Sequence, residues 1–142
     1  MAQSFTGDDD FLLVAGDHLW SVNDINRVWN CEQTAIGALQ VEDWHKYGVL
    51  MVKDGLLQGI KEKPKEFVGD LINTSLYRFT PDIYRYIEQL EPSERGEYEI
   101  TDALTAIAKN QKVRVVSLED YWLDLGTLED IPKVSQHIAK LN

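Results

Sequence analysis

The chain has little of what secreted and membrane proteins need. Its 142 residues include one cysteine, Cys31, so no disulfide can form within the chain. No apolar run is long enough to span a bilayer, and residues 1–6 lack the basic and apolar parts of a signal peptide. We therefore expect a cytoplasmic protein without a membrane segment, because chains without disulfides are typical of reducing compartments.

Basic charge is also scarce. The chain has 14 Lys and Arg residues against 24 Asp and Glu residues, which gives a formal net charge of -10. Nucleic acids and anionic membranes attract basic surfaces, so we expect neither as a partner. A phosphate ligand would need a local basic patch or a bound metal.

Alternating strands and helices are predicted, in one α/β domain that covers residues 1–142. Asp54-Gly55 predicts a β-hairpin, which we expect to be the antiparallel part of a mixed sheet. The run 11–16 is apolar throughout and predicts a central strand, buried on both faces and with neighbours on both sides. The expected strands are 11–16, 34–41, 47–53, 56–61, 71–79 and 113–118, and the expected helices are 21–33 and those that begin at Thr80-Pro81, Thr101 and Thr127.

Two aspartates follow short apolar runs. Asp17 comes after the run 11–16, and Asp124 ends a second run just before the helix expected from Thr127. Aspartates at the carboxyl ends of neighbouring strands are well placed to hold one divalent cation. The alternative is that each aspartate only begins a turn. The histidines are scattered and show no metal-ligand spacing: they are His18, His45 and His137.

Further polar residues stand where an expected strand ends or inside one. Glu62 and Lys63 precede Pro64, which is expected to hold Lys63 in an extended conformation. A lysine there suits a phosphate and a glutamate suits sugar hydroxyls, whereas the alternative is a solvated run of charges. Asn73 lies inside an apolar strand, where its amide needs a partner from the backbone or from a ligand.

Six segments, taken in order, resemble the sugar-1-phosphate nucleotidylyltransferase family, which includes glucose-1-phosphate thymidylyl- and uridylyltransferases. Each segment alone is weak, but six in the family's order are specific. The resemblance extends from about residue 10 to the C-terminus and implies a partial Rossmann-like nucleotidyltransferase fold with a mixed sheet and a β-hairpin insertion. The segments are Gly16-Asp17, Tyr47-Gly48-Val49, Glu62-Lys63-Pro64, the strand with Asn73-Thr74-Ser75-Leu76-Tyr77, residues 96–102 (GEYEITD) and residues 122–127 (WLDLGT).

The resemblance implies a nucleotidylyl transfer that depends on a metal. Asp17 and Asp124 would bind a catalytic Mg²⁺, and Lys63 would contact the phosphate of a sugar 1-phosphate. That phosphate would attack the α-phosphate of a nucleoside triphosphate and release pyrophosphate.

The resemblance also implies a sugar pocket. Glu62, Asn73 and the backbone around Gly48 would hold the sugar, and Tyr77 would line the pocket. A substrate-side loop found in some members of the family matches Arg95 and Glu97.

The family also carries a G-x-G-T-R loop that holds the triphosphate, and a glycine where this chain has Ser75. No such loop occurs in the 142 residues. The resemblance therefore implies that N-terminal nucleotide-binding βα units are missing, and that a nucleoside triphosphate binds only if that half is supplied.

We expect the chain alone to be inactive, and to form a homo-oligomer because an unpaired strand edge invites pairing. The alternatives are a non-enzymatic sugar-phosphate-binding or regulatory module, or one subunit of a split enzyme.

Overall fold

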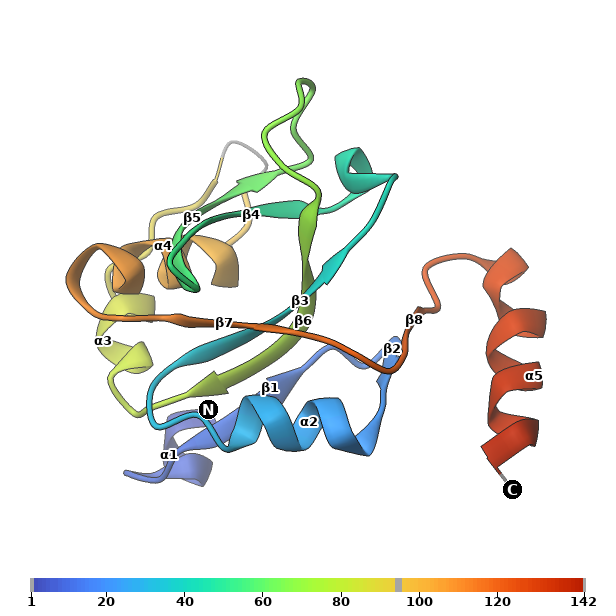
Figure 1. Ribbon diagram of the computed structural model, residues 1–142. Helices are drawn as coiled ribbons and strands as arrows, with labels where there is room; N and C mark the ends of the chain where they lie inside the picture. The colour runs from blue at the N-terminus through green and yellow to red at the C-terminus, as the bar shows by residue number, and fades with distance from the viewer. Residues whose placement is uncertain (1, 94–95, 142) are drawn as a thin grey trace.

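A six-stranded sheet forms the centre of the protein in the computed structural model, which describes residues 2–93 and 96–141 (Figure 1). β4 also pairs with β6, so the pairings run in a ring from β6 through β3, β7, β5 and β4 back to β6. The strand order is β1 (Phe11–Val14), β6 (Leu71–Phe79), β3 (Ala35–Gln40), β7 (Arg114–Ser117), β5 (Leu56–Glu62) and β4 (Gly48–Lys53).

The sheet is mixed, as expected for this α/β chain. Within the described ranges β3 and β7 are the one parallel pair, and every other pairing of this sheet is antiparallel. The expectation that the hairpin alone would be antiparallel is therefore wrong. The physical reason is that the long strand β6 returns between β1 and β3, and antiparallel pairing needs no crossover helix.

Helices cover both faces of this sheet. α3 (Ile83–Ile87) and α4 (Ile100–Asn110) pack on one face, and α2 (Val22–Trp29) packs on the other. Ala35 and Ile36 are neighbours in β3 and point into these two separate apolar clusters, as alternation along a strand requires. The first cluster includes Phe79, Ile83, Leu104 and Ile107, and the second includes Val28, Leu76 and Leu118.

The remaining elements lie at the periphery. α1 (Ala2–Thr6) comes before β1, and two 3₁₀ turns, η1 (Trp44–Lys46) and η2 (Leu128–Asp130), precede β4 and α5 (Ile131–Leu141). α5 stands to one side of the sheet (Figure 1). None of the helices in residues 2–93 and 96–141 has the length and apolar character needed to cross a membrane.

The hairpin between β4 and β5 confirms the prediction from Asp54-Gly55. Both turn residues have positive φ, 53° at Asp54 and 73° at Gly55. A two-residue loop with positive φ at both positions twists in the same sense as the strands that it joins.

The first strand differs from its prediction. β1 covers Phe11–Val14 and lies at the edge of the sheet, where its one strand neighbour among the described residues is β6. The side chains of Leu13 and Val14 are 39% and 47% exposed, so this strand is not buried on both faces. A short apolar run shows that a segment has affinity for other apolar groups, but not which neighbours it will have.

The start of α2 is as the sequence predicts. Ser21 caps this helix, since its Oγ accepts a hydrogen bond from the Asp24 backbone N–H at 3.0 Å. The helix expected from Thr127 starts later: Thr127 and Asp130 form a capping box that opens the 3₁₀ turn η2, and α5 begins at Ile131.

Other helix boundaries differ from expectation. α2 ends at Trp29 and not near residue 33, and Val22 in its first turn is 72% exposed. α3 begins at Ile83, two residues after Pro81. Thr101 lies inside α4, because partly buried Ile100 packs on the core and moves the cap position back to Glu99.

Candidate functional site

Asp17 and Asp124 are brought together by a second, two-stranded sheet. Its strands are β2 (His18–Trp20) and β8 (Trp122–Asp124), which run antiparallel with His18 opposite Asp124. The Leu125 backbone N–H donates to the Asp17 carbonyl at 2.9 Å, so the pairing continues past both strands. Asp124 ends its strand as expected, but Asp17 comes just before the strand β2. The two aspartates are neighbours because β2 and β8 pair antiparallel, and not because two neighbouring strands both end in an aspartate.

His18 lies between the two carboxylates. Its Nε2 is 3.4 Å from Asp124 Oδ1 and 3.8 Å from Asp17 Oδ1. The His18 side chain is 11% exposed, against 63% for Asp17 and 28% for Asp124. The carboxylates therefore face both a buried imidazole and the solvent.

The two carboxylates suit a hard divalent cation. Mg²⁺ binds through one or two protein carboxylates and takes its remaining ligands from water and substrate phosphates. Two partly exposed carboxylates on adjacent strands leave room for such ligands. The described residues contain no group of three or more His, Cys, Asp or Glu side chains placed to hold a metal, so a closed structural site is not formed there.

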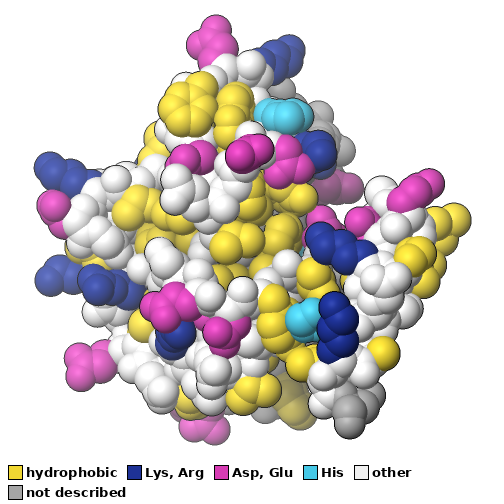
Figure 2. Space-filling view, turned by 45° about the vertical axis from the view of Figure 1, so that its right-hand side comes forward, with side chains coloured by type: hydrophobic (Ala, Val, Ile, Leu, Met, Phe, Trp, Pro, Cys, Tyr) yellow, Lys and Arg dark blue, Asp and Glu magenta, His cyan; other side chains and the backbone are white. Residues whose placement is uncertain are grey.

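A cavity of about 600 Å³ opens beside Asp124. Tyr47 lines it and packs edge-to-face on Trp122, with ring centroids 5.5 Å apart. Burial raises the pKa of Tyr47, and the charges of Asp43 and Asp124 raise it further. Charged groups of both signs surround the cavity, and they are Asp43, Lys46, Asp124, Asp130 and Lys133. The space-filling view shows acidic and basic side chains in the notch beside α5 (Figure 2).

A second group of predicted residues gathers where β4, β5 and β6 meet. Gly48 pairs with Glu62 across the hairpin, and a side chain at Gly48 would meet Glu62 Oε2 at 2.8 Å. Asn73 Nδ2 donates to the Tyr77 hydroxyl at 2.7 Å. Burial raises the pKa of Tyr77, and the negative charge of Glu62 contributes in the same direction. Gly48, Glu62, Asn73 and Tyr77 therefore form one cluster.

Asn73 has partners for both ends of its amide. Besides the bond to Tyr77, its Oδ1 accepts from the Ser75 backbone N–H at 2.9 Å. Ser75 has a φ of 57°, in the left-handed region, and Asn73 stabilises this kink in β6. These bonds match the structural alternative for Asn73, and contact with a sugar stays a prediction.

The other predicted residues are less closely placed. Lys63 is exposed and has a φ of 39°, so the expected extended conformation is wrong. Its N–H donates to the Tyr47 carbonyl at 3.1 Å, and this bond holds the chain in a turn despite the following proline. Glu97 is exposed, and its carbonyl accepts from the Ser93 N–H at 2.8 Å. Arg95 lies outside the described residues.

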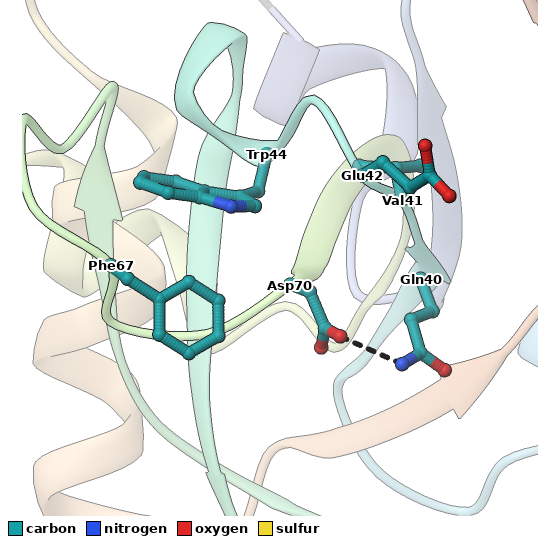
Figure 3. A pocket seen from close by; sticks show the side chains of 6 residues that line it. All are labelled: Gln40, Val41, Glu42, Trp44, Phe67 and Asp70. Atoms are coloured by element: carbon teal, nitrogen blue, oxygen red, sulfur yellow. Dashed lines mark hydrogen bonds between the residues drawn. The ribbon is translucent and has the colours of Figure 1, made fainter.

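A second hollow of about 450 Å³ shares the lining residue Val41 with the cavity beside Asp124. Trp44 and Phe67 line it next to each other and pack edge-to-face, with ring centroids 5.4 Å apart (Figure 3). Gln40 Nε2 donates to Asp70 Oδ2 at 2.7 Å. None of the residues predicted for the site lines this hollow.

The nucleotidyl transferase family model matches residues 1–141. The chain belongs to this family. A bifunctional sugar-1-phosphate nucleotidylyltransferase/acetyltransferase of Sulfurisphaera tokodaii is 36% identical in an alignment of 120 positions, which covers 83% of this chain and 30% of that protein. A UTP–glucose-1-phosphate uridylyltransferase of Haloferax volcanii is 33% identical in an alignment of 142 positions, which covers 94% of this chain and 58% of the relative.

The fold matches the family as well. The structure of a UTP-bound UGPase from Acinetobacter baumannii superposes with a TM-score of 0.81 and 22% identity, over 96% of this chain and 53% of that one. The resemblance drawn from six short segments is thus confirmed. The chain spans less than two thirds of each of these relatives.

Sequence reasoning missed several residues of this nucleotidyl transferase chain. His18 is one of three histidines that look scattered in the sequence, yet its Nε2 lies 3.4 Å from Asp124 Oδ1 and 3.8 Å from Asp17 Oδ1. Its position directly after Asp17 was the available signal. Nothing in the sequence pairs Tyr47 with Trp122, because that contact joins segments far apart in the chain.

Proposed function

We propose that this chain carries the metal-binding and sugar-phosphate-binding residues of a sugar-1-phosphate nucleotidylyltransferase, an enzyme that makes nucleotide sugars. The observation that supports this most is the β2–β8 pairing, which sets Asp17 and Asp124 side by side in a chain of the nucleotidyl transferase family. Sugar 1-phosphates are the proposed substrates because relatives of the chain include a sugar-1-phosphate nucleotidylyltransferase/acetyltransferase and a UTP–glucose-1-phosphate uridylyltransferase.

The proposed reaction exchanges one phosphorus–oxygen bond for another. A phosphate oxygen of the sugar 1-phosphate bonds to the α-phosphorus of the nucleoside triphosphate. The bond from that phosphorus to the bridging oxygen breaks, and its electron pair leaves with pyrophosphate. No general base is required, because the attacking phosphate is already ionised.

Asp17 and Asp124 would hold Mg²⁺, which when bound neutralises charge on the triphosphate and aligns the attack. The protein's own groups would position the other substrate. Lys63 is an exposed cation next to Glu62 and would contact the sugar phosphate as a point charge.

The cluster of Gly48, Glu62, Asn73 and Tyr77 would form the sugar side of the pocket. Gly48 leaves space in which the Glu62 carboxylate lies over the backbone, where it can accept bonds from sugar hydroxyls. Arg95 and Glu97 remain proposed contacts of a substrate-side loop. With phosphorylated substrates and a single cysteine, we also propose a cytoplasmic location.

Binding of glucose 1-phosphate to the purified chain tests the proposal, with calorimetry as the measurement. We expect glucose 1-phosphate to bind more tightly than glucose or inorganic phosphate. Glu62→Gln and Lys63→Ala should each weaken binding by roughly tenfold, about the worth of one charged hydrogen bond. Lys65→Ala is the matched control, since Lys65 is equally exposed and lies two residues away. Binding that is equal for all four proteins would overturn the sugar-phosphate assignment.

A further inference from the structure

His18 has no role in the resemblance to the family or in the function proposed above. Its side chain is nevertheless only 11% exposed, and its Nε2 lies 3.4 Å from Asp124 and 3.8 Å from Asp17, the two aspartates proposed to bind the metal. Its ring is held edge-on between Trp20 and Trp122, with centroids 5.6 Å and 5.1 Å away. A side chain so enclosed cannot turn away from the carboxylates without disturbing two tryptophans.

The partners of the imidazole indicate which nitrogen carries a hydrogen. The Trp122 indole N–H can only donate, and it donates to His18 Nδ1 at 3.3 Å. Nδ1 is therefore the acceptor, and the ring hydrogen of neutral histidine is on Nε2. The Thr74 carbonyl, 3.2 Å from Nδ1, accepts from the Trp20 indole N–H at 3.1 Å, so it has a donor other than this ring.

The opposite arrangement would place a hydrogen on Nδ1, which could donate to the Thr74 carbonyl but would face the Trp122 N–H. It would also leave a lone pair on Nε2 facing two carboxylates, which is repulsive. The hydrogen on Nε2 instead lies on the ring nitrogen next to Asp17 and Asp124, where it acts on both carboxylates electrostatically.

We propose that His18 is a positioning residue that holds Asp17 and Asp124 side by side for a divalent cation, through the hydrogen on Nε2. This rests on the proposed metal role of the two aspartates. Two neighbouring carboxylates repel each other, and a fixed N–H between them offsets that repulsion. Groups that orient ligating carboxylates in this way change metal affinity by about 10- to 100-fold.

His18 is not itself a metal ligand in this arrangement. A metal ion binds the lone pair of an imidazole nitrogen. The lone pair on Nδ1 is used by Trp122, and Nε2 carries the hydrogen. The histidine therefore acts on the metal through the aspartates.

The first test is the nitrogen NMR spectrum of His18 in the chain, assigned with the variant His18→Gln. We expect Nε2 to be protonated both in the metal-free chain and after Mg²⁺ is added. An unprotonated Nε2 in either state would overturn the proposal. Loss of the Nε2 hydrogen on adding Mg²⁺ would show that His18 is a ligand.

The second test uses two amide variants of the same residue. Glutamine places an N–H at the position of Nε2, whereas asparagine places its amide at the position of Nδ1. Mn²⁺ binding, followed by electron paramagnetic resonance, should weaken about tenfold in His18→Asn and stay close to the parent chain in His18→Gln. Equal losses in both variants, or no loss in either, would overturn the positioning role. Circular dichroism shows that each variant is folded.

Asp17→Asn and Asp124→Asn in the same titration separate the two ideas. If neither changes Mn²⁺ binding, the metal role of the aspartates is wrong, and the inference about His18 fails with it. If both abolish binding while His18→Asn binds like the parent chain, only the role of His18 is wrong.

Discussion

Gly126 lies where a side chain would press on Asp124. A Cβ at this position would be 3.2 Å from Asp124 Oδ1, closer than a carboxylate and a methyl group normally approach, and 3.5 Å from Oδ2, which is an ordinary contact. The glycine in the segment 122–127 therefore keeps the Asp124 carboxylate in its place. Gly16, next to the other aspartate, has open space around it.

Gly126→Ala should weaken Mn²⁺ binding by roughly tenfold, because the methyl group displaces the Asp124 carboxylate. Its free energy of unfolding should change by less than about 0.5 kcal/mol, since the site is exposed. Gly16→Ala is the control and should bind Mn²⁺ like the parent chain. The idea is wrong if the two alanine variants bind Mn²⁺ equally well. Electron paramagnetic resonance measures the binding.

Ser75 holds a backbone conformation that costs free energy for any residue with a Cβ. Its φ of 57° lies in the left-handed region, which is strained by roughly 1–2 kcal/mol for non-glycine residues. The kink is kept by the bond from its N–H to Asn73 Oδ1. A glycine here would have the same conformation without the strain.

Ser75→Gly should be more stable than Ser75→Ala by about 1 kcal/mol. Both changes remove the hydroxyl, so the difference between them isolates the effect of the Cβ. Urea unfolding, extrapolated to water, gives the two free energies. Equal stability of the glycine and alanine variants would mean that the kink relaxes and carries no strain.

At the scale of whole elements, Asp24 joins α2 to the loop between β7 and β8. Asp24 is fully buried, and its carboxylate accepts from the backbone N–H groups of Glu119 at 2.9 Å and Asp120 at 3.1 Å. It also accepts from Ser21 Oγ at 2.9 Å. The helix start and the strand that carries Asp124 are thus held by one side chain.

Asp24→Ala should destabilise the fold by about 3 kcal/mol, because the buried Ser21 hydroxyl and the two part-buried N–H groups of Glu119 and Asp120 lose their acceptor together. Ser21→Ala, which removes only the cap of α2, should cost about 1 kcal/mol. Urea unfolding of both variants gives the comparison. A cost for Asp24→Ala no larger than that for Ser21→Ala would show that water replaces the carboxylate.

For the molecule as a whole, β1 presents an open edge. Leu13 and Val14 are exposed beside unpaired backbone groups, since β1 pairs with β6 alone among the described strands. Such an edge is a template for pairing with a second chain. The expected homo-oligomer stays a prediction, and this edge is where we place its contact.

Leu13→Lys should lower self-association at micromolar concentration, measured by light scattering, because a charge on an edge strand opposes strand pairing. Val22→Lys is the control, because it adds the same charge at another exposed apolar residue, on α2. A parent chain that is monomeric throughout would refute the prediction. So would an equal effect of the two lysine variants.

The sequence by itself determined the features that depend on residues close together in the chain. Asp54-Gly55 predicted the hairpin because the turn needs two residues with positive φ. Ser21 and the pair Thr127–Asp130 predicted helix starts because a cap bonds to a backbone N–H within three residues. The same local reading singled out Asp17 and Asp124.

The tertiary structure alone decided which distant segments become neighbours. The run 11–16 looked central because burial preference is a property of side chains, whereas an edge position depends on how many strands arrive beside it. His18 looked isolated because its partner Trp122 lies 104 residues further along the chain. Local chemistry selects the strands, turns and caps, but contacts across the sheet bring His18 to the two aspartates, and no local pattern records those contacts.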